Sequence, residues 1–423
     1  MKEIKNINSC RVCQSKNFIP ILSLGEQYIS NFIESEEHQG VKGPLELVLC
    51  DLNQGGCGLL QLKHSVSPEL LWNDQYWYKS GISSTIKEDL KDIAIKIQKL
   101  IVLQKSDIVL DIGCNDGTMF NSFEKEKNLT LVGFDPSKNV AREAMKVANK
   151  VFNNFFNATD FKKEFGDKKA KIITAISMFY DLDNPNDFLK DIVSVLDKYG
   201  IFIIQQNYLV SMLEQNAFDN ICYEHLEYYS MSVLKGLLSK YNLEIFDVEL
   251  NDINGGSIRT YIKFKDNEKI KAFSGSKERL ARILEKENTM KLDTVKPYQE
   301  FALRVKEIKS QLLNFIREEK EKGKKISIYG ASTRGNTALQ YFSLNNNLID
   351  MAADKNPDKW GKKTIGTLIP IVPPETYREM KPDYLLVMTW HFFNEIKNQE
   401  KDFFDNGGKF ILAMPQFKVI EKK

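Results

Sequence analysis

One stretch of this sequence constrains the fold more than any other, because an apolar run ends in an acidic residue and passes directly into a glycine turn. Residues 108–110 (IVL) are typical of a buried strand, and residues 111–117 (DIGCNDG) follow them. Glycine permits the sharp turn and the close approach of a ligand to the backbone. We expect a helix to begin near Thr118, whose free N–H groups would face the same crevice. The stretch predicts a ligand site at the edge of an α/β sheet.

A second apolar run ends in an acidic residue about one strand later. Residues 131–134 (LVGF) precede Asp135 and Pro136, so Asp111 and Asp135 would stand at the carboxyl ends of adjacent strands. A carboxylate at the second position can accept hydrogen bonds from both hydroxyls of a ribose. The spacing differs from Gly-x-Gly-x-x-Gly, which favours a single nucleoside carrying an amino acid over a dinucleotide. A structural turn in another doubly wound domain is the alternative.

The turn resembles the S-adenosylmethionine site of class I methyltransferases, whose first motif is Asp/Glu-x-Gly-x-x-x-Gly. Asp111, Gly113 and Gly117 fit that motif. The resemblance implies that S-adenosylmethionine is the cofactor. It also implies a set of cofactor-binding residues, namely Asp111, Gly113, Asn115, Gly117, Asp135, Pro136 and Ser177.

Length and composition bound the remaining possibilities. The 423 residues correspond to about three domains of ordinary size, and 42% hydrophobic and 27% charged residues are typical of a globular protein. A formal net charge of +2 leaves no excess of cations to neutralise nucleic-acid phosphates. We therefore expect a small-molecule substrate, and neither nucleic acid nor membrane as a partner.

The sequence also predicts the compartment. No apolar run approaches the roughly 18 residues of a membrane span, and the N-terminus leads into polar residues rather than the apolar core of a signal peptide. These features predict a cytoplasmic protein. Six cysteines in so long a chain argue against a disulfide framework, and a reducing compartment favours metal binding by cysteines that cluster.

Four of the cysteines lie in the N-terminal region with metal-ligand spacing. They form two pairs, Cys10 with Cys13 and Cys50 with Cys57. Four soft thiolates are the ligands that tetrahedral zinc prefers. Six residues separate the second pair, more than the roughly two to four usual in zinc modules, and four free reduced cysteines are the alternative. Because no fifth ligand lies nearby, we expect the zinc to be structural.

An alternation of strands and helices continues through the middle of the chain. Strands are expected at residues 171–177 and 201–205. An aromatic segment, residues 71–81, precedes the strand predicted at residues 108–110. The alternation predicts one open, mainly parallel sheet with ligands at the carboxyl ends of its strands. The aromatic segment is either packing between domains or a substrate lid with phenol groups pointing inward.

A polar and aromatic stretch further along contains His225, one of only four histidines, directly after Glu224. Histidine titrates near neutrality, so a histidine beside a carboxylate is a natural general base. A hydrogen-bonded structural histidine is the alternative. Later in the chain, Gly255 and Gly256 indicate a turn at which the backbone approaches another group closely.

The last third of the chain predicts a second α/β unit. A long helix should end at a glycine cap, Gly323. Its buried face is predicted to consist of Phe301, Val305, Ile308, Leu312 and Phe315. A strand then enters a loop that begins at Gly330 and opens another helix, whose N-terminus could bind a phosphate. Arg334 offers a fork of donors suited to diphosphate oxygens, and a structural turn is the alternative.

With these residues in view, the whole chain resembles the three-domain, zinc-bearing nucleotide-sugar C-methyltransferases that make branched deoxysugars. The shared motifs, in order, are the four cysteines, Asp-x-Gly-x-x-x-Gly, Glu224-His225, Gly255-Gly256-Ser257, the Gly330 loop, DKNPDKWG (354–361), IPI (369–371) and residues 382–390. The resemblance implies an α/β fold in three parts. These are an N-terminal zinc-binding module at 1–66, a central class I methyltransferase Rossmann-like domain at 67–270 and a C-terminal Rossmann-like domain at 271–423 that binds the nucleotide sugar.

The resemblance also implies roles for individual residues. His225 would remove the proton next to a ketone, and the resulting enolate would attack the methyl group of the sulfonium. The implied catalytic residues are His225, Glu224, Tyr223, Tyr76 and Asp181, and the implied substrate-binding residues are Tyr78, Ser332, Thr333, Arg334, Asn336, Asp354 and Trp390. Two positions depart from the family, because Asp181 stands where relatives have a histidine and Cys222 where they have a tyrosine.

Three other functions compete with this one. An O- or N-methyltransferase acting on a nucleotide sugar would need a base but no enolate. A non-catalytic nucleotide-sugar binder would not need the intact acids and glycines of the first site. A nicotinamide oxidoreductase could use the Gly330 loop.

Enolate chemistry would require fixed donors such as Tyr76, Tyr78 or Tyr223, because imidazole alone removes a proton next to a ketone slowly.

Overall fold

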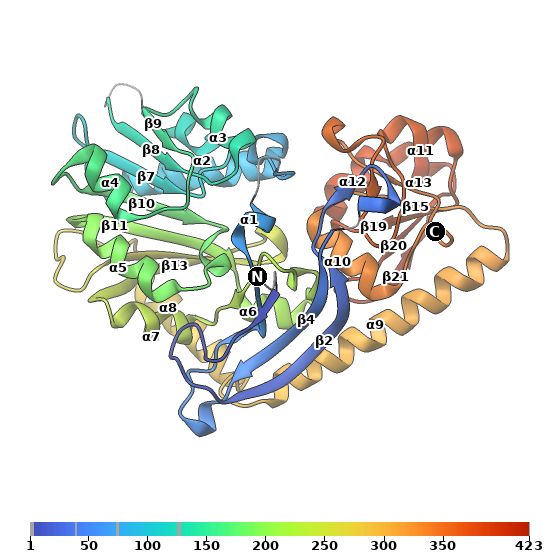
Figure 1. The fold of residues 1–423 in the computed structure, drawn as a ribbon, viewed down its shortest axis with the longest axis horizontal. Helices are drawn as coiled ribbons and strands as arrows, with labels where there is room; N and C mark the ends of the chain where they lie inside the picture. Colours follow the sequence, from blue (N-terminus) through green and yellow to red (C-terminus); the bar gives the residue numbers. More distant parts are fainter. Residues whose placement is uncertain (1–3, 39, 73–75, 125–127, 423) are drawn as a thin grey trace.

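A computed structural model describes residues 4–38, 40–72, 76–124 and 128–422. The predicted aromatic segment therefore contains three residues, 73–75, that lie outside the described residues. Figure 1 shows two lobes, with the N-terminal strands β2 and β4 between them. The long helix α9 (Lys296–Glu321) runs beneath these strands toward the second lobe.

The first lobe is built on a seven-stranded sheet with the order β13-β14-β11-β10-β7-β8-β9. Its strands are β7 (Ile108–Ile112), β8 (Thr130–Phe134), β9 (Lys150–Phe152), β10 (Ala170–Ile176), β11 (Leu196–Asn207), β13 (Leu243–Asn251) and β14 (Ser257–Phe264). Strands β7 to β11 pair in parallel, and β14 is antiparallel to β11 and β13. The chain passes from β7 to β8 on one side and resumes at β10 on the other. The predicted mainly parallel sheet is confirmed, with its topological switch point between β7 and β10.

Every residue of β7 is buried, as expected of a strand covered on both faces. The helices of this lobe are α2 (Ser84–Leu100), α3 (Lys138–Ala144), α4 (Ala158–Phe165), α5 (Pro185–Val195), α6 (Leu209–Glu214), α7 (Met231–Ser239) and α8 (Ser276–Thr289). One expectation needs correction, because the glycine turn leads only into a 3-10 helix, η4 (Thr118–Ser122). Its sequence, TMFNS, contains few strong helix formers.

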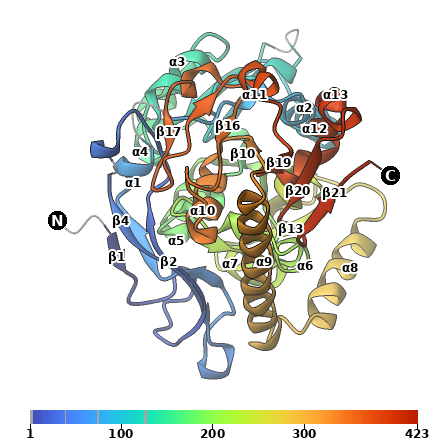
Figure 2. The same cartoon turned by 90° about the vertical axis from the view of Figure 1, so that its right-hand side faces the viewer.

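The N-terminal strands are joined to both lobes. They are β1 (Ile4–Asn6), β2 (Phe18–Tyr28), β3 (Phe32–Ile33), β4 (Lys42–Cys50), β5 (Leu60–Leu62) and β6 (His64–Val66). Strand β12 (Glu227–Tyr228), from the central part of the chain, pairs with β5 at the edge of their antiparallel sheet. Strand β3 pairs with β17 (Lys363–Thr364) of the second lobe. Figure 2 shows β2 between β4 and α9, and β2 packs against α9 and α10, so the N-terminal strands connect the two halves of the molecule.

The second lobe contains a six-stranded sheet with the order β18-β16-β15-β19-β20-β21. Its elements are β15 (Ile326–Tyr329), α10 (Thr333–Phe342), β16 (Met351–Ala353), β18 (Ile371–Val372), α11 (Pro374–Met380), β19 (Tyr384–Val387), α12 (Phe393–Gln399), α13 (Lys401–Asp405), β20 (Lys409–Leu412) and β21 (Lys418–Ile420). All pairings are parallel except that of β21 with β20. The expected second α/β unit is confirmed, while the exact bounds of the three parts stay a prediction.

Helix α9 buries most of its predicted face against β2, α6 and α10. Of the predicted positions, Phe301, Val305, Ile308 and Leu312 are buried, and Phe315 is half-buried. The residue after the helix cap, Gly323, has a φ of +77°, as expected for a glycine that ends a helix. None of the helices in the described part of the chain combines the length and the apolar character needed to cross a membrane.

Candidate active site and metal centre

A cavity of about 260 Å³ lies at the carboxyl ends of β7, β8 and β10, where the sheet topology predicts a ligand site. Six of the seven predicted cofactor residues line it, namely Asp111, Gly113, Asn115, Asp135, Pro136 and Ser177. Tyr76, Tyr78 and Asp181 line the same cavity. Gly117 has another reason to be glycine, because its φ is +76° and a Cβ there would lie 2.9 Å from the Cα of Ala144 in α3.

The backbone of the glycine turn holds the carboxylate of Asp135. Its Oδ2 accepts a hydrogen bond from the Asn115 N–H at 2.9 Å, and its Oδ1 accepts one from the Ser137 N–H at 2.9 Å. Burial raises the pKa of Asp135 to about 6, although these two N–H groups act in the opposite direction. Each carboxylate oxygen can accept a further hydrogen bond. The side chain is therefore fixed and keeps acceptor capacity for a pair of hydroxyl groups.

Asp111 lies in β7 beside this turn. Its Oδ1 accepts a hydrogen bond from the Thr174 hydroxyl of β10 at 2.6 Å, across the switch point. Burial raises the pKa of Asp111 to about 7. In the turn, the Asn115 side chain accepts a hydrogen bond from the Ser80 N–H at 3.0 Å and donates one to the Tyr78 carbonyl at 3.1 Å. These bonds attach the glycine turn to the aromatic segment, so the two form adjoining walls of the cavity.

The aromatic segment contacts the cavity on one side and the N-terminal strands on the other. Trp72, Tyr76 and Tyr78 line the cavity. In contrast, Trp77 packs edge-on against Phe32 of β3, with 5.4 Å between the ring centroids. The segment therefore combines packing between parts of the protein with a wall of tyrosines at the site.

Two carboxyl groups, Asp181 and Glu224, interact with each other and with the Tyr76 phenol. Burial raises the pKa of both carboxyl groups, and the charge of Glu224 raises that of Asp181 further. Burial and then these two neighbours raise the pKa of Tyr76 well above its usual value. Asp181 Oδ1 and Glu224 Oε2 are buried, and neither has a hydrogen-bond partner among the described residues. The raised pKa shifts each of the three groups toward its protonated form, and the two carboxyl groups keep hydrogen-bonding capacity that the described residues do not use.

The imidazole of His225 is held in one tautomer. Its Nδ1 lies 2.9 Å from the Asn220 carbonyl oxygen, so Nδ1 carries the proton and Nε2 keeps its lone pair. The Tyr180 ring meets the imidazole edge-on, with 4.5 Å between centroids. Burial and, to a smaller extent, the guanidinium of Arg334 lower the pKa of His225 to about 3. The ring is therefore neutral at neutral pH, with no proton on Nε2, and its low pKa makes it a weak base.

Tyr223 points away from this group. Its hydroxyl donates a hydrogen bond to the Gly43 carbonyl of β4 at 2.5 Å, within the N-terminal sheet. Tyr223 is not among the described residues that line the cavity, and neither are Glu224 and His225, but the next residue, Leu226, is. Of the predicted catalytic residues, Tyr76 and Asp181 line the cavity, and His225 packs against Tyr180, the neighbour of Asp181 in the chain. Tyr223 lies in a turn and points toward the N-terminal sheet.

Arg334 and Trp390, predicted to bind the substrate, contact the first lobe. Arg334 donates Nη2 to Asp219 Oδ2 at 2.6 Å and Nη1 to the Asn254 carbonyl at 3.1 Å. Trp390 donates Nε1 to the same Asp219 oxygen at 3.4 Å. A Cβ on Gly255 would lie 3.0 Å from the Trp390 ring. The glycine pair predicted to permit a close approach therefore meets the second lobe.

The other predicted substrate residues of the second lobe are also engaged by the protein. The contacts are Ser332 Oγ with the Gly335 N–H at 2.9 Å, the Thr333 carbonyl with the Ser30 hydroxyl at 2.9 Å, the Asn336 amide with the Asn31 carbonyl at 2.8 Å, and the Asp354 carboxylate with the Ala331 N–H at 2.8 Å. These bonds cap α10 and attach it to the N-terminal strands. A role of these side chains toward a substrate stays a prediction.

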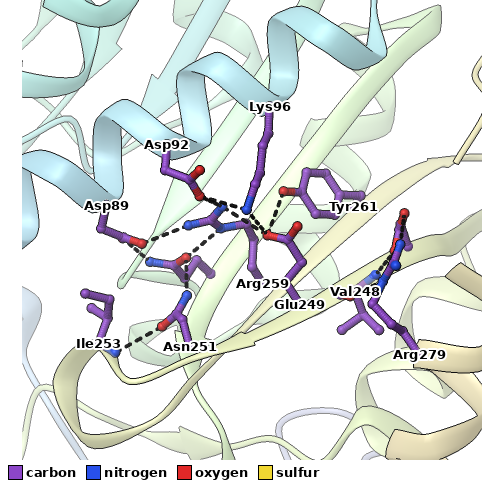
Figure 3. Close-up of polar contacts among 12 residues, drawn as sticks. Asp89, Asp92, Lys96, Val248, Glu249, Asn251, Ile253, Arg259, Tyr261 and Arg279 are labelled. Atoms are coloured by element: carbon purple, nitrogen blue, oxygen red, sulfur yellow. Dashed lines mark hydrogen bonds and ion pairs between the residues drawn. The ribbon is translucent and has the colours of Figure 1, made fainter. Parts of the chain in front are cut away.

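The sequence did not predict a buried ionic network at the rim of the cavity. Figure 3 shows the polar contacts of this network. Arg259 on β14 is 2% exposed, and its guanidinium pairs with Asp89 at 2.8 Å, Asp92 at 2.7 Å and Glu249 at 3.2 Å. Its Nε donates to Gln205 Oε1 at 2.7 Å. Asp89 and Gln205 both line the cavity. An arginine within an apolar strand was a usable signal, but its partners come from α2, β11 and β13, which only the fold brings together.

The four N-terminal cysteines meet at one point. Their sulfur atoms all lie within 4.8 Å of one another, with Cys10 at 3.6 Å from Cys57 and Cys13 at 3.5 Å from Cys50. A tetrahedral shell with Zn–S bonds of about 2.3 Å places its sulfur atoms about 3.8 Å apart. Hydrogen bonding to the Cys10 sulfur raises the pKa of Cys50 to about 12, so the thiols resist ionising together without a cation. The donor set therefore fits a closed zinc site.

Comparison with known proteins matches the chain in three successive parts. Family models for a zinc binding domain, a methyltransferase domain and a C-methyltransferase C-terminal domain match residues 10–72, 86–248 and 252–415. The C-methyltransferase NovU of Streptomyces niveus is 28% identical over 424 residues, covering 99% of this chain and 98% of that protein.

Solved structures resemble only part of the chain. The plantazolicin methyltransferase BpumL in complex with SAH is 16% identical, with a TM-score of 0.33 over 41% of this chain and 82% of that chain. The PH0226 protein from Pyrococcus horikoshii OT3 is 19% identical, with a TM-score of 0.35 over 44% of this chain and 94% of that chain. At these scores neither likeness adds to the assignment.

The protein is an S-adenosylmethionine-dependent methyltransferase that carries zinc. This class follows from the matched family models, the cavity at the switch point with its two acidic residues, and the cluster of four cysteines. The match extends over almost the whole length of a C-methyltransferase and includes the C-terminal domain particular to such enzymes. In its three matched parts the chain is similar to the zinc-bearing C-methyltransferases.

Removing the charge of Arg259 should destabilise the first lobe. In Arg259→Met, the buried carboxylate of Asp89 would lose its cationic partner, whereas Glu249 would keep Lys96; breaking a buried pair costs about 3–5 kcal/mol. Thermal unfolding should report this as a lower Tm. Lys150→Met, which breaks the half-exposed ion pair with Glu164, should cost no more than about 1 kcal/mol. Equal Tm values for the two variants would contradict the importance of the network.

Freshly purified protein should contain about one zinc ion per chain, since four thiolates close one tetrahedral shell. Cys57→Ser should lose most of the metal, whereas Cys114→Ser, at a cysteine buried in the first lobe, should keep it. Elemental analysis of the protein gives the stoichiometry directly. Metal-free protein with all thiols reactive, or full zinc content in Cys57→Ser, would contradict the assignment of the ligands.

Proposed function

We propose that this enzyme transfers a methyl group to a carbon atom of a nucleotide-linked keto-deoxysugar. S-adenosylmethionine, when bound, supplies the methyl group. We assign its nucleoside to the switch-point cavity, with Asp135 accepting the ribose hydroxyls and the backbone at Gly113 and Asn115 lying beside it. The proposal of a sugar substrate rests on the order of motifs along the whole chain, and the proposal of a carbon acceptor agrees with the family.

The observation that carries the proposed chemistry is the neutral imidazole of His225. Its Nδ1 proton is occupied by the Asn220 carbonyl, so Nε2 is the atom that would accept the proton from the carbon next to a ketone. The same nitrogen would return the proton to solvent after the turnover. Imidazole alone is too weak for rapid removal of such a proton, so other groups must stabilise the enolate oxygen.

We assign that stabilisation to Tyr76 and Asp181. Both line the cavity, and burial raises the pKa of both groups. A carboxylic acid kept neutral by its surroundings can donate a hydrogen bond to a developing oxyanion. Asp181 would therefore take over the place that a histidine has in the enzymes this chain resembles. Glu224 would support it as the neighbouring carboxyl group.

Two further residues follow from their positions. Tyr78 is 45% exposed and lines the cavity, so we assign it to the sugar or its nucleotide at the cavity mouth. The hydroxyl of Tyr223 is committed to the N-terminal sheet, and we assign Tyr223 a structural role in place of the catalytic role that the resemblance implied.

Loss of the Asp135 carboxylate should weaken S-adenosylhomocysteine binding. A hydrogen bond to a charged group is worth about 1.5–3 kcal/mol, so the Kd of Asp135→Ala should rise roughly tenfold to a hundredfold. The affinity of the unchanged protein should also fall as the pH drops through about 6, because protonation removes the charged acceptor. Isothermal calorimetry measures both effects. Asp197→Ala, at the amino end of β11, is the control, and an unchanged Kd in Asp135→Ala would place the nucleoside elsewhere.

His225 should catalyse exchange at carbon even without methyl transfer. With S-adenosylhomocysteine bound, in heavy water and with a panel of nucleotide 4-keto-sugars, the carbon next to the ketone should take up deuterium faster with enzyme than without it. His225→Gln keeps much of the shape of histidine but lacks the basic nitrogen, so it should abolish both exchange and methylation. NMR and mass analysis of the recovered sugar give the position and extent of labelling.

The same experiment separates the alternatives. An O- or N-methyltransferase would methylate a sugar of the panel with no enzyme-dependent exchange at carbon, and that result would exclude the enolate mechanism. A His225→Gln variant that methylates at full rate would move the base to Asp181 or Glu224. Binding of S-adenosylhomocysteine to the variant should be unchanged, which controls for misfolding.

A further inference from the structure

Arg334 of α10 and Asp219 of the 3-10 helix η7 (Phe218–Asn220) form an ion pair between the two lobes. Arg334 Nη2 lies 2.6 Å from Asp219 Oδ2, and the two side chains are 14% and 2% exposed. Because both charges are largely removed from water, neither can be replaced without leaving the other unpaired. The pair therefore fixes η7 relative to the second lobe.

The residue that follows Asp219 holds the proposed base. The Asn220 carbonyl accepts the Nδ1–H of His225 at 2.9 Å. The Asn220 side chain is itself fixed, since its Oδ1 accepts a hydrogen bond from Asn207 Nδ2 at 2.7 Å. One short turn thus carries both the anion that binds Arg334 and the carbonyl that orients the imidazole.

We infer that Arg334 and Asp219 act as a positioning pair for His225, through which the second lobe fixes the orientation of the imidazole. The inference rests on the proposed role of His225 as the base. It gives the C-terminal domain a part in the chemistry in addition to any contact with the substrate. Neither residue of the pair needs to touch the substrate for this effect.

The charges of the pair also act on the imidazole. After burial, the Arg334 guanidinium is the main cause that lowers the pKa of His225. The Tyr180 ring packs against the imidazole, and the Tyr228 hydroxyl donates to the same Asn220 carbonyl. Asp181, Cys222 and Glu224 act in turn on the phenols of Tyr180 or Tyr228. Arg334→Gln changes none of these and leaves Asp219 as an unpaired anion one residue from Asn220. The loss of the Arg334 cation and the uncompensated charge of Asp219 should both raise the pKa of His225.

This role differs from the diphosphate contact predicted from the sequence. Both terminal nitrogens of Arg334 already donate to protein oxygens, those of Asp219 and of the Asn254 carbonyl. A diphosphate at this guanidinium would have to compete with Asp219 for it. The two roles make different predictions for nucleotide binding and for the titration of His225.

The test follows the ring nitrogens of 15N-labelled histidine by NMR in the full-length, zinc-loaded protein. The chain has four histidines, and His225→Gln identifies the signal of His225. In the unchanged protein, His225 should stay neutral, as the Nδ1–H tautomer, down to about pH 5. In Arg334→Gln, its protonation midpoint should rise by about one to three pH units. In Asp219→Asn, the Nδ1–H tautomer should lose its dominance.

Two variants serve as controls. Arg334→Lys keeps a cation and should keep the pKa of His225 low. Asp358→Asn breaks a different ion pair, with Lys79 at 2.7 Å, and should leave the His225 signal unchanged. A shift of equal size in Asp358→Asn would show a general disturbance and overturn the inference. Binding of S-adenosylhomocysteine to each variant confirms that it is folded.

The inference fails if Arg334→Gln and Asp219→Asn, both folded, leave the titration and the tautomer of His225 as they were. A tenfold loss of affinity for thymidine diphosphate in Arg334→Gln, with His225 unaffected, would assign Arg334 to the substrate instead. The NMR titration needs no substrate and no turnover. Full methylation by His225→Gln would therefore overturn the base and the proposed function separately from the effect of Arg334 on the imidazole.

Discussion

Buried charged groups must be partnered, and this requirement shapes the region where the three parts of the protein meet. Arg11, next to Cys10 of the metal cluster, is 3% exposed. It donates to the Leu62 and His64 carbonyls at 2.7 and 3.1 Å and pairs with Asp183 at 3.1 Å. Asp183 lines the cofactor cavity. Because a buried guanidinium is costly to leave unpaired, the zinc site and the cavity wall are linked through a single side chain.

Two more buried arginines join elements that are distant in the chain. Arg259 ties α2, β11 and β13 together at the rim of the cavity, and Arg334 ties α10 of the second lobe to η7 of the first. A planar guanidinium has five N–H donors, so it can satisfy several acceptors at once where a lysine would satisfy fewer. These arginines therefore hold separate elements together in addition to supplying charge. Several of the residues that they bond, such as Asp89 and Gln205, line the cavity.

The same lack of water sets the chemistry that is available. Burial raises the pKa of Asp111, Asp135 and Asp181 and lowers that of His225. In the proposed mechanism, Asp135 at one end of the site accepts the ribose hydroxyls, and Asp181 at the other end donates a proton beside the neutral imidazole. Acid and base groups that are pushed apart in pKa by one apolar environment can work in the same step. Under this proposal, Asp181 in place of a histidine changes the donor but keeps a proton available.

The sequence by itself determined the parts that depend on local pattern. Period and turn chemistry gave the strand before Asp111, the switch-point sheet and the buried face of α9, because neighbours in sequence share one strand or helix face. The spacing of the four N-terminal cysteines predicted a metal cluster, since a short loop holds each pair of thiols together. The resemblance of the motif order gave the class of enzyme, and the comparisons confirm it.

Only the tertiary structure decided which side chains face the site. Tyr223 is adjacent to Glu224 in sequence, yet its hydroxyl bonds to the Gly43 carbonyl in the N-terminal sheet. Arg334 was predicted from its loop to face a diphosphate, and it pairs with Asp219, which lies 115 residues away in the chain. Such partners follow from how separate sheets and helices pack, because a guanidinium or a phenol removed from water bonds to whatever acceptor the packing brings within reach. No local window of sequence contains that information.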